Sequence, residues 1–204
     1  MKRGKGRAVA GLLAATGVAA VGGAPAQAAA PDGKGPWADA ALYSKQGKRA
    51  DGTAVLPSRS NPKAAVGVAE DTTGDGTFFS LGFGGEIVLG FLNPIVNGTG
   101  ADMDLQLVEA TFEPYPAEVV DVYVLAKRGR SWTWVKVASN VNKDAQLALP
   151  TDVKETHVVR LVDVSDKSLF TGPNLNADGY DVDGVKALHT AGGSNESDFD
   201  QNSD

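Results

Sequence analysis

Residues 78–109 have the sequence FFSLGFGGEIVLGFLNPIVNGTGADMDLQLVE, and their pattern indicates the architecture of the chain. Apolar residues alternate with polar or small ones on both sides of a loop rich in Gly, Asn and Pro. A period of two is typical of strands with one face on a core and one on water. The glycines are predicted to occupy turns and bulges. We therefore predict an antiparallel hairpin of a β-sandwich, and the stretch contains no standard catalytic motif.

The same alternation continues through the rest of the chain. Its segments are residues 86–91, 103–107, 119–126, 133–138, 157–163 and 182–188. Turn-forming pairs of Asn, Gly and Pro separate them, and no amphipathic helix of convincing length is present. About eight short strands with regular turns predict an all-β fold, a two-sheet antiparallel β-sandwich of the jelly-roll or immunoglobulin-like kind.

The two ends differ from this pattern. The first 28 residues combine a basic start, an apolar stretch and small residues before Ala28, the order of a cleaved secretory signal peptide. Residues 29–37 then form a predicted linker, and residues 38–189 a single β-sandwich domain. Residues 190–204 are polar and acidic, so we expect them to be disordered. The protein is predicted to be secreted.

Charge and composition restrict the partners. The formal net charge is −6, and removal of the four signal-peptide cations lowers it to −10. An acidic surface argues against nucleic-acid binding, which needs Lys and Arg to neutralise phosphates. No segment after the signal peptide is apolar enough to span a membrane. The chain has no cysteine, so its stability must come from the core and from any bound metal.

Several segments together resemble a family of secreted bacterial β-sandwich modules. They are Ser80–Gly85 (SLGFGG), Asn93–Gly98 (NPIVNG) and Gly179–Val185 (GYDVDGV). More distantly, the chain is similar to galactose-binding-like jelly rolls, including many carbohydrate-binding modules. The resemblance implies a structural calcium held on the last strand, where Asp183 and Asp181 match. No sugar-binding aromatic platform of that family matches this sequence residue by residue.

Acids in the predicted strands suggest the same metal. Asp183 and Glu109 share the parity of apolar neighbours, and a carboxylate on a core face is costly unless it is paired, protonated or metal-bound. Calcium takes carboxylate and carbonyl oxygens, so the sequence predicts a structural calcium site. Its other candidate ligands are Asp102 and Asp104 of the opening stretch and Asp71 and Asp75 of a Gly-rich turn. The alternative is that each acid lies at a strand end, solvated or paired with Arg160 or Lys186.

Trp132 and Trp134 lie two residues apart, so a strand places both on one face together with Lys136. Thr133, Val135 and Val137 then form the core face. An exposed pair of indole rings beside a cation can stack on sugar rings, which makes the two tryptophans candidate ligand-binding residues. The alternative is that they pack on a loop or on the sheet edge.

Catalysis has little support. His157 and His189 are the only histidines, no serine lies in a G-x-S-x-G motif, and residues 82–85 lack the Lys and Ser/Thr of a phosphate loop. We therefore predict a non-enzymatic, secreted binding or cell-exterior module, whose partner is a surface polysaccharide or an extracellular protein. Two alternatives stay open: a small extracellular hydrolase or lyase with a carboxylate-based site, and a purely structural exoprotein.

Overall fold

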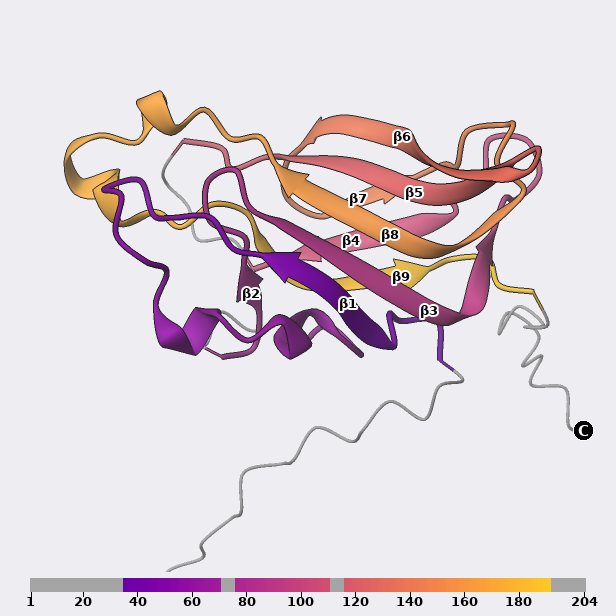
Figure 1. Ribbon diagram of the computed structural model, residues 1–204, viewed down its shortest axis with the longest axis horizontal. Helices are drawn as coiled ribbons and strands as arrows, with labels where there is room; N and C mark the ends of the chain where they lie inside the picture. The colour runs from indigo at the N-terminus through magenta and orange to yellow at the C-terminus, as the bar shows by residue number, and fades with distance from the viewer. Residues whose placement is uncertain (1–34, 71–75, 111–115, 192–204) are drawn as a thin grey trace, which may run out of the picture.

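The computed structural model describes residues 35–70, 76–110 and 116–191, and two antiparallel sheets dominate it (Figure 1). The larger sheet has the order β1 (Ala40–Lys45), β3 (Glu86–Val96), β8 (Glu155–Asp163), β5 (Val120–Arg128) and β6 (Ser131–Val141). The smaller sheet has the order β2 (Phe79–Ser80), β9 (Asp181–Ala187), β4 (Leu105–Glu109) and β7 (Ala145–Leu147). The predicted fold class, an all-β two-sheet antiparallel sandwich, is confirmed.

The alternating apolar residues fill the space between the sheets. On β3, Ile87 and Leu89 are fully buried, while Val88 between them is only partly covered. On β5 and β8, Val122, Val124 and other core residues show the same period of two. Burial of such side chains is the main stabilising contribution to the fold. Each sheet thus has one face toward the core.

The predicted hairpin between the two halves of residues 78–109 is wrong. β3 pairs with β1 and β8, whereas β4 pairs with β7 and β9, so the loop between them crosses from one sheet to the other. Asp104 fixes this crossing, because its carboxylate accepts hydrogen bonds from the backbone N–H groups of Gly98 and Leu149, both at 2.6 Å. A period of two predicts a strand and its faces but does not specify its partner.

Two glycines of the same stretch permit a close approach of backbones. Gly82 has φ +70°, and a Cβ atom there would lie 2.5 Å from the carbonyl carbon of Gly47. A Cβ atom on Gly85 would lie 1.8 Å from the carbonyl oxygen of Leu81. Any larger residue at these positions displaces the backbone. The glycines therefore serve the crossing of chain segments as well as turns.

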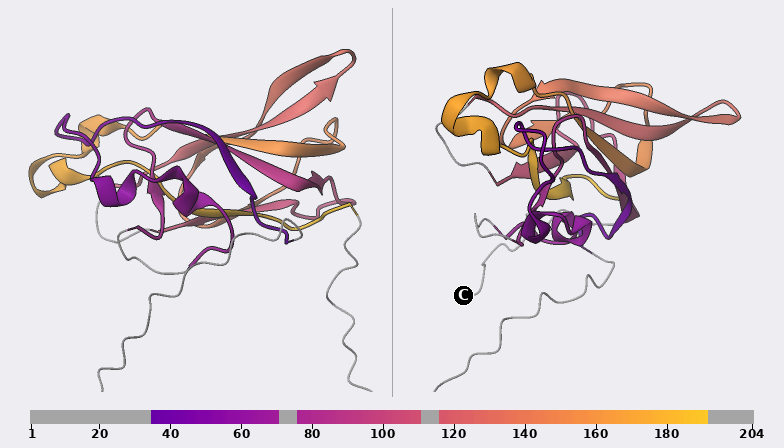
Figure 2. Two further views of the ribbon diagram at one scale, coloured as in Figure 1. Left: turned by 60° about the horizontal axis from the view of Figure 1, so that its bottom comes forward. Right: turned by 60° about the vertical axis from the view of Figure 1, so that its left-hand side comes forward.

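The remaining regular structure of the described residues is four short 3-10 helices, which lie at one end and along one side of the sandwich (Figures 1 and 2). They are η1 (Pro57–Arg59), η2 (Pro62–Ala65), η3 (Lys167–Leu169) and η4 (Gly172–Asn176). Within the described ranges, no helix has the length and apolarity needed to cross a membrane. The predicted signal peptide and the final residues 192–204 lie outside these ranges.

The smaller sheet departs from simple alternation at β9, which is buried on both faces. The segment containing Trp37 and Ala69 covers its outer side, since a Cβ atom on Gly184 would lie 3.0 Å from the Trp37 ring. The pairing with β4 skips one residue, so Asp183 is the extra residue of a β-bulge. The prediction that the side chain of Asp183 points to the same face as that of Val185 is therefore wrong, because the bulge changes the alternation between these two residues.

Candidate ligand-binding face

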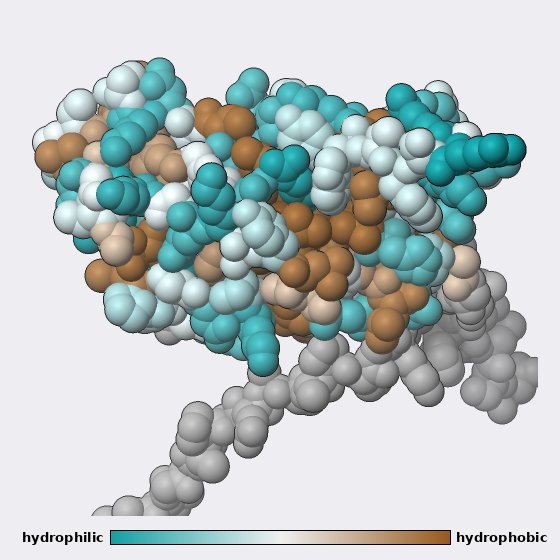
Figure 3. All heavy atoms as spheres, viewed as in Figure 1, coloured by the Kyte–Doolittle hydropathy of each residue, from teal (hydrophilic) through white to brown (hydrophobic). Residues whose placement is uncertain are grey.

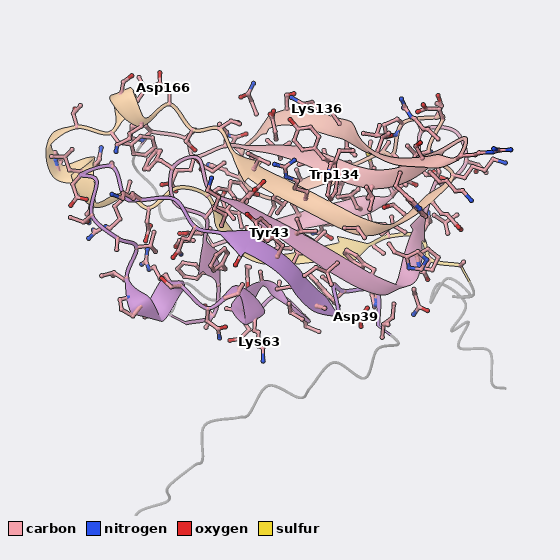
Figure 4. The ribbon with its side chains drawn as sticks, viewed as in Figure 1. Asp39, Tyr43, Lys63, Trp134, Lys136 and Asp166 are labelled. Atoms are coloured by element: carbon pink, nitrogen blue, oxygen red, sulfur yellow. The ribbon has the colours of Figure 1, made fainter. Side chains whose placement is uncertain are left out.

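The outer face of the larger sheet carries a row of side chains that crosses all five strands. The strand registers place these residues side by side in the order Tyr43, Val88, Arg160, Tyr123 and Lys136. Tyr43 is 51% exposed, and Lys136 also faces solvent. Figure 4 shows Tyr43, Trp134 and Lys136 on this side of the sheet. The row joins aromatic rings and cations on one solvent-facing surface.

Trp132 and Trp134 belong to the same face, on the edge strand β6. Their exposed fractions are 61% and 40%, while Val135 between Trp134 and Lys136 is buried. The prediction that the tryptophans face away from the core is confirmed. The alternative, packing on a loop or on the sheet edge, holds in part, because β6 is an edge strand and Trp132 lines a cleft with Asp152 and Lys154 of the loop before β8. We call the set Tyr123, Trp132, Trp134, Lys136 and Arg160 the aromatic face.

Arg160 lies at the centre of the aromatic face and is held in place from three sides. Its Nε donates to Oε2 of Glu86 at 2.7 Å, and its Nη2 forms an ion pair with the same oxygen. Its guanidinium carbon is 5.7 Å from the ring centres of both Tyr123 and Trp134. Cation–π contacts of this kind orient the rings and the cation together. Arg160 is thus paired with Glu86 and not with the acids of β9.

Lys136 and Asp121 form the second polar group of the face. Lys136 Nζ donates to Oδ2 of Asp121 at 2.5 Å and lies 5.2 Å from the Tyr123 ring centre. Tyr123 donates its hydroxyl to the same carboxylate oxygen at 3.2 Å. Burial alone would raise the pKa of Asp121, but hydrogen bonds from Lys136 and from the backbone N–H of Asn140 lower it below its usual value. The carboxylate is therefore ionised at neutral pH.

This arrangement combines flat apolar rings with fixed donors and acceptors. Indole and phenol rings offer large rigid surfaces whose burial on binding costs little conformational entropy. The carboxylates and cations already hold one another in position, so they do not need to be ordered when a ligand arrives. The face is suited to a ligand that has flat apolar surfaces and many hydroxyl groups.

A cleft of about 440 Å³ continues the aromatic face at the tip of the β5–β6 hairpin. Backbone pairing of β5 with β8 ends at Val124 and Val159, and Thr156 then donates its hydroxyl to the carbonyl of Leu125 at 3.0 Å. Beyond this point the hairpin rises away from the sandwich (Figure 2). Trp132 and four charged side chains line the resulting cleft: Lys127, Asp152, Lys154 and Glu155.

The predicted calcium ligands are divided between the two ends of the smaller sheet. Asp104 lies beside the end of β9, where the Leu188 N–H donates to its carbonyl, and His189 lies 3.2 Å from its carboxylate. Asp102, nearby, is exposed. Glu109 pairs with Val182, near the start of β9. Leu105, next to Asp104, pairs with Ala187 at the other end of β9, and the four residues between Leu105 and Glu109 span about 13 Å along the strand. Asp102 and Asp104 therefore do not meet Asp183.

The acids of β9 have partners within the protein. Asp181 accepts a hydrogen bond from the Ser80 hydroxyl at 2.5 Å, and Asp183 accepts one from the backbone N–H of Glu70 at 3.2 Å. Within the described residues, no group of three or more His, Cys, Asp and Glu side chains could hold a metal ion. Asp71 and Asp75 lie outside these residues, so calcium at Asp183 stays a prediction.

A group of buried acids near the start of β9 was not predicted as a group. Glu118 is 5% exposed, and burial, with repulsion from Asp178, raises its pKa to about 8. Burial likewise raises the pKa of Asp163, Asp178 and Asp181. Glu118 and Asp178 lie outside the strands, so alternation gave no signal for them.

Comparisons with known proteins identify no family. No family model matches the chain, and no curated protein matches it. Among solved structures, it is similar to chitosan-binding module 1 of a chitosanase/glucanase from Paenibacillus sp. IK-5, with 12% identity, coverage of 72% of this chain and 92% of that one, and a TM-score of 0.42. It is also similar to the C-terminal domain of a chitobiase from Bacteroides fragilis, with 11% identity, coverage of 76% and 94%, and a TM-score of 0.39. At these scores, neither likeness assigns a ligand to this chain.

Proposed function

We propose that this protein is a non-catalytic carbohydrate-binding module that holds a polysaccharide on its aromatic face. The observation that carries the proposal is the exposure of Trp132 and Trp134 on one side of an edge strand. Single exposed apolar side chains are common on protein surfaces, but neighbouring ones that form a patch mark a binding site more often. The position of the two tryptophans beside fixed charged groups favours a ligand that is apolar on one surface and polar at its edges.

The polar groups of the face fit hydroxyl-rich ligands. A hydroxyl group both donates and accepts a hydrogen bond. Arg160 and Lys136 supply donors in one row of the sheet, and Glu86 and Asp121 supply acceptors in the neighbouring row, two residues away along each strand. A sugar residue stacked on Trp134 would have both kinds of group at its edge. This complementarity favours a glycan over a wholly apolar ligand.

The carboxylate-based hydrolase or lyase is the weaker alternative. Glycosidases need a pair of acids that face the substrate, one of them with a raised pKa. Among the described residues, the acids with a raised pKa are Asp163, Asp178, Asp181 and Glu118, and each is at most 5% exposed. Asp121 lies on the aromatic face but is bound to Lys136, and its pKa is lowered. These acids are poorly placed to protonate a bound glycan.

The proposed site of action is outside the cell. The first 28 residues support export, since they have the basic, apolar and small-residue order of a signal peptide. Export would bring the aromatic face into contact with wall or matrix polysaccharides. Secretion is tested by N-terminal sequencing of the protein from the culture medium, with a start at residue 29 expected.

The binding proposal is tested with cellulose, chitin, xylan and polygalacturonate in pull-down and affinity electrophoresis. We expect the protein to bind at least one of them and the double variant Trp132→Ala/Trp134→Ala to bind it about tenfold or more weakly, as for the loss of central aromatic contacts. Leu169→Ala, which removes an exposed apolar side chain on η3, serves as the matched control. Circular dichroism verifies that each variant is folded. Equal binding by the double variant would contradict the proposal.

A further inference from the structure

The tip of the β5–β6 hairpin concentrates positive charge on a chain whose formal net charge is −6. Lys127, Arg128 and Arg130 lie at the tip, and Lys154 lines the same cleft from the β8 side. All four are exposed. Figure 3 shows this end of the molecule as strongly hydrophilic, next to the apolar centre of the larger sheet. The distribution of cations is therefore uneven, and the excess lies beside Trp132.

Most of these cations are not neutralised by the protein. Arg128 forms an ion pair with Asp152 across the cleft. Within the part of the chain that the structure describes, Lys127, Arg130 and Lys154 form no ion pair. Two cations, Lys127 and Lys154, and two acids, Asp152 and Glu155, line the cleft, and Arg130 lies at the adjoining hairpin tip. Because Arg128 neutralises Asp152, Glu155 is the one lining acid that remains against these three cations. A local excess of positive charge attracts an anionic group and is strengthened by partial exclusion of water in a cleft.

Trp132 joins this charge to the aromatic face. Its ring is 61% exposed and lines the cleft, and Trp134 lies two residues further along the same strand. The spacing along a strand places the two side chains about 7 Å apart on one face. A glycan stacked on Trp134 would therefore reach Trp132 and the cleft with an adjacent sugar residue.

We propose that the cleft binds an acidic sugar residue, a ring that carries a carboxylate or a phosphate group. This inference rests on the proposed function and specifies its ligand class. The ring stacks on Trp132, and the anionic group lies between Lys127 and Lys154, with Arg130 adding to the potential. The acidic remainder of the surface favours short acidic segments of a glycan over a long polyanion such as nucleic acid.

The test uses isothermal titration with tetragalacturonate and its methyl ester, which have the same backbone and differ in charge. A second pair, phosphorylated and unmodified maltotriose, distinguishes a phosphate ligand from a carboxylate ligand. The variants are Lys127→Gln/Lys154→Gln, Trp132→Ala, and Lys63→Gln as a control, since Lys63 is an exposed cation on η2 (Figure 4). All the substituted side chains are exposed, and circular dichroism verifies folding.

We expect one acidic ligand to bind more tightly than its uncharged partner, and the difference to shrink as salt is added. Each exposed cation contributes about a two- to fivefold effect, so the double lysine variant should bind the acidic ligand about four- to twenty-fivefold more weakly. The same variant should leave the affinity for the uncharged ligand unchanged. Trp132→Ala should weaken binding of both, and Lys63→Gln should change neither.

Three results would overturn the inference. Equal affinity for charged and uncharged ligands, combined with loss of binding in Trp132→Ala, would refute the acidic-sugar site and leave the proposed function intact. Binding of the acidic ligand that needs the lysines but survives Trp132→Ala would reveal attraction between charges without recognition of a sugar. Absence of binding to these and to every polysaccharide of the panel above would refute the proposed function itself.

Discussion

Replacement of Glu118 by Gln should change how the stability of this protein depends on pH. Glu118 is 5% exposed, and its Oε1 accepts a hydrogen bond from the backbone N–H of Gly179 at 2.9 Å. Burial is the largest cause of its raised pKa, followed by repulsion from Asp178, Glu109 and Asp163. A glutamine keeps an oxygen that can accept the Gly179 hydrogen bond but cannot ionise. The variant therefore removes the charge and preserves the contact.

The sign and size of the effect follow from the two pKa values of Glu118. Its pKa is about 8 in the folded protein and 4.5 as the ordinary value. Between these values the folded state retains the proton while the unfolded chain loses it, so the free energy of unfolding falls as pH rises. The difference corresponds to at most roughly 5 kcal/mol above pH 8. Glu118→Gln should therefore unfold like the wild type near pH 4 and be more stable by a few kcal/mol near pH 8.

Urea denaturation from about pH 4 to about pH 9 measures this difference directly. Asp163, Asp178 and Asp181 are also buried acids with a raised pKa, so part of the pH dependence should remain in the variant. Glu155→Gln, a substitution of an exposed glutamate on β8, is the control and should leave the pH dependence unchanged. Identical slopes for the wild type and Glu118→Gln between about pH 5 and about pH 8 would show that Glu118 does not retain its proton in the folded protein.

Three further predictions concern stability. Asp104→Ala leaves the buried N–H of Leu149 and the half-buried N–H of Gly98 without their acceptor, and should lower the free energy of unfolding in urea by about 2–5 kcal/mol. A loss of less than about 1 kcal/mol would contradict the bridging role. Gly85→Ala forces a Cβ atom to within 1.8 Å of the Leu81 carbonyl oxygen and should prevent native folding, as judged by near-UV circular dichroism; a native spectrum would contradict the close approach. If calcium binds at Asp183, EDTA should lower Tm and added calcium restore it, whereas an unchanged midpoint would argue against the metal.

The fold class could be predicted from the sequence because its cause is local. Alternation of apolar and polar residues around Ile87 and Leu89, and again on β5 and β8, indicates which side chains are buried in the core. The partner of each strand is not recorded in this way. β3 and β4 look like a hairpin in the sequence, but contacts made by Asp104 with Gly98 and with Leu149, 45 residues further on, direct them into different sheets.

The candidate site shows the same division between local and distant causes. The parity of Trp132 and Trp134 predicted their exposed side correctly, because β6 is regular at these residues. Parity failed at Asp183, where a bulge inserts one residue. The contribution of Arg160 to the aromatic face depends on the strand order β3-β8-β5, which places it between Glu86 and Tyr123. The sequence indicated only that Arg160 lies on the face opposite the core, because it stands between the core residues Val159 and Leu161.

Binding of a glycan by the aromatic face is best tested by the dissociation constant of the Trp134→Ala variant. The measurement is isothermal titration with whichever polysaccharide or oligosaccharide the wild type binds most tightly. Trp134 is 40% exposed, and its ring centre lies 5.7 Å from the guanidinium carbon of Arg160. Removal of the ring therefore takes away a stacking surface without opening the core. We predict an affinity about tenfold or more below that of the wild type, with little change in Tm. An unchanged dissociation constant in a folded Trp134→Ala protein would contradict the account.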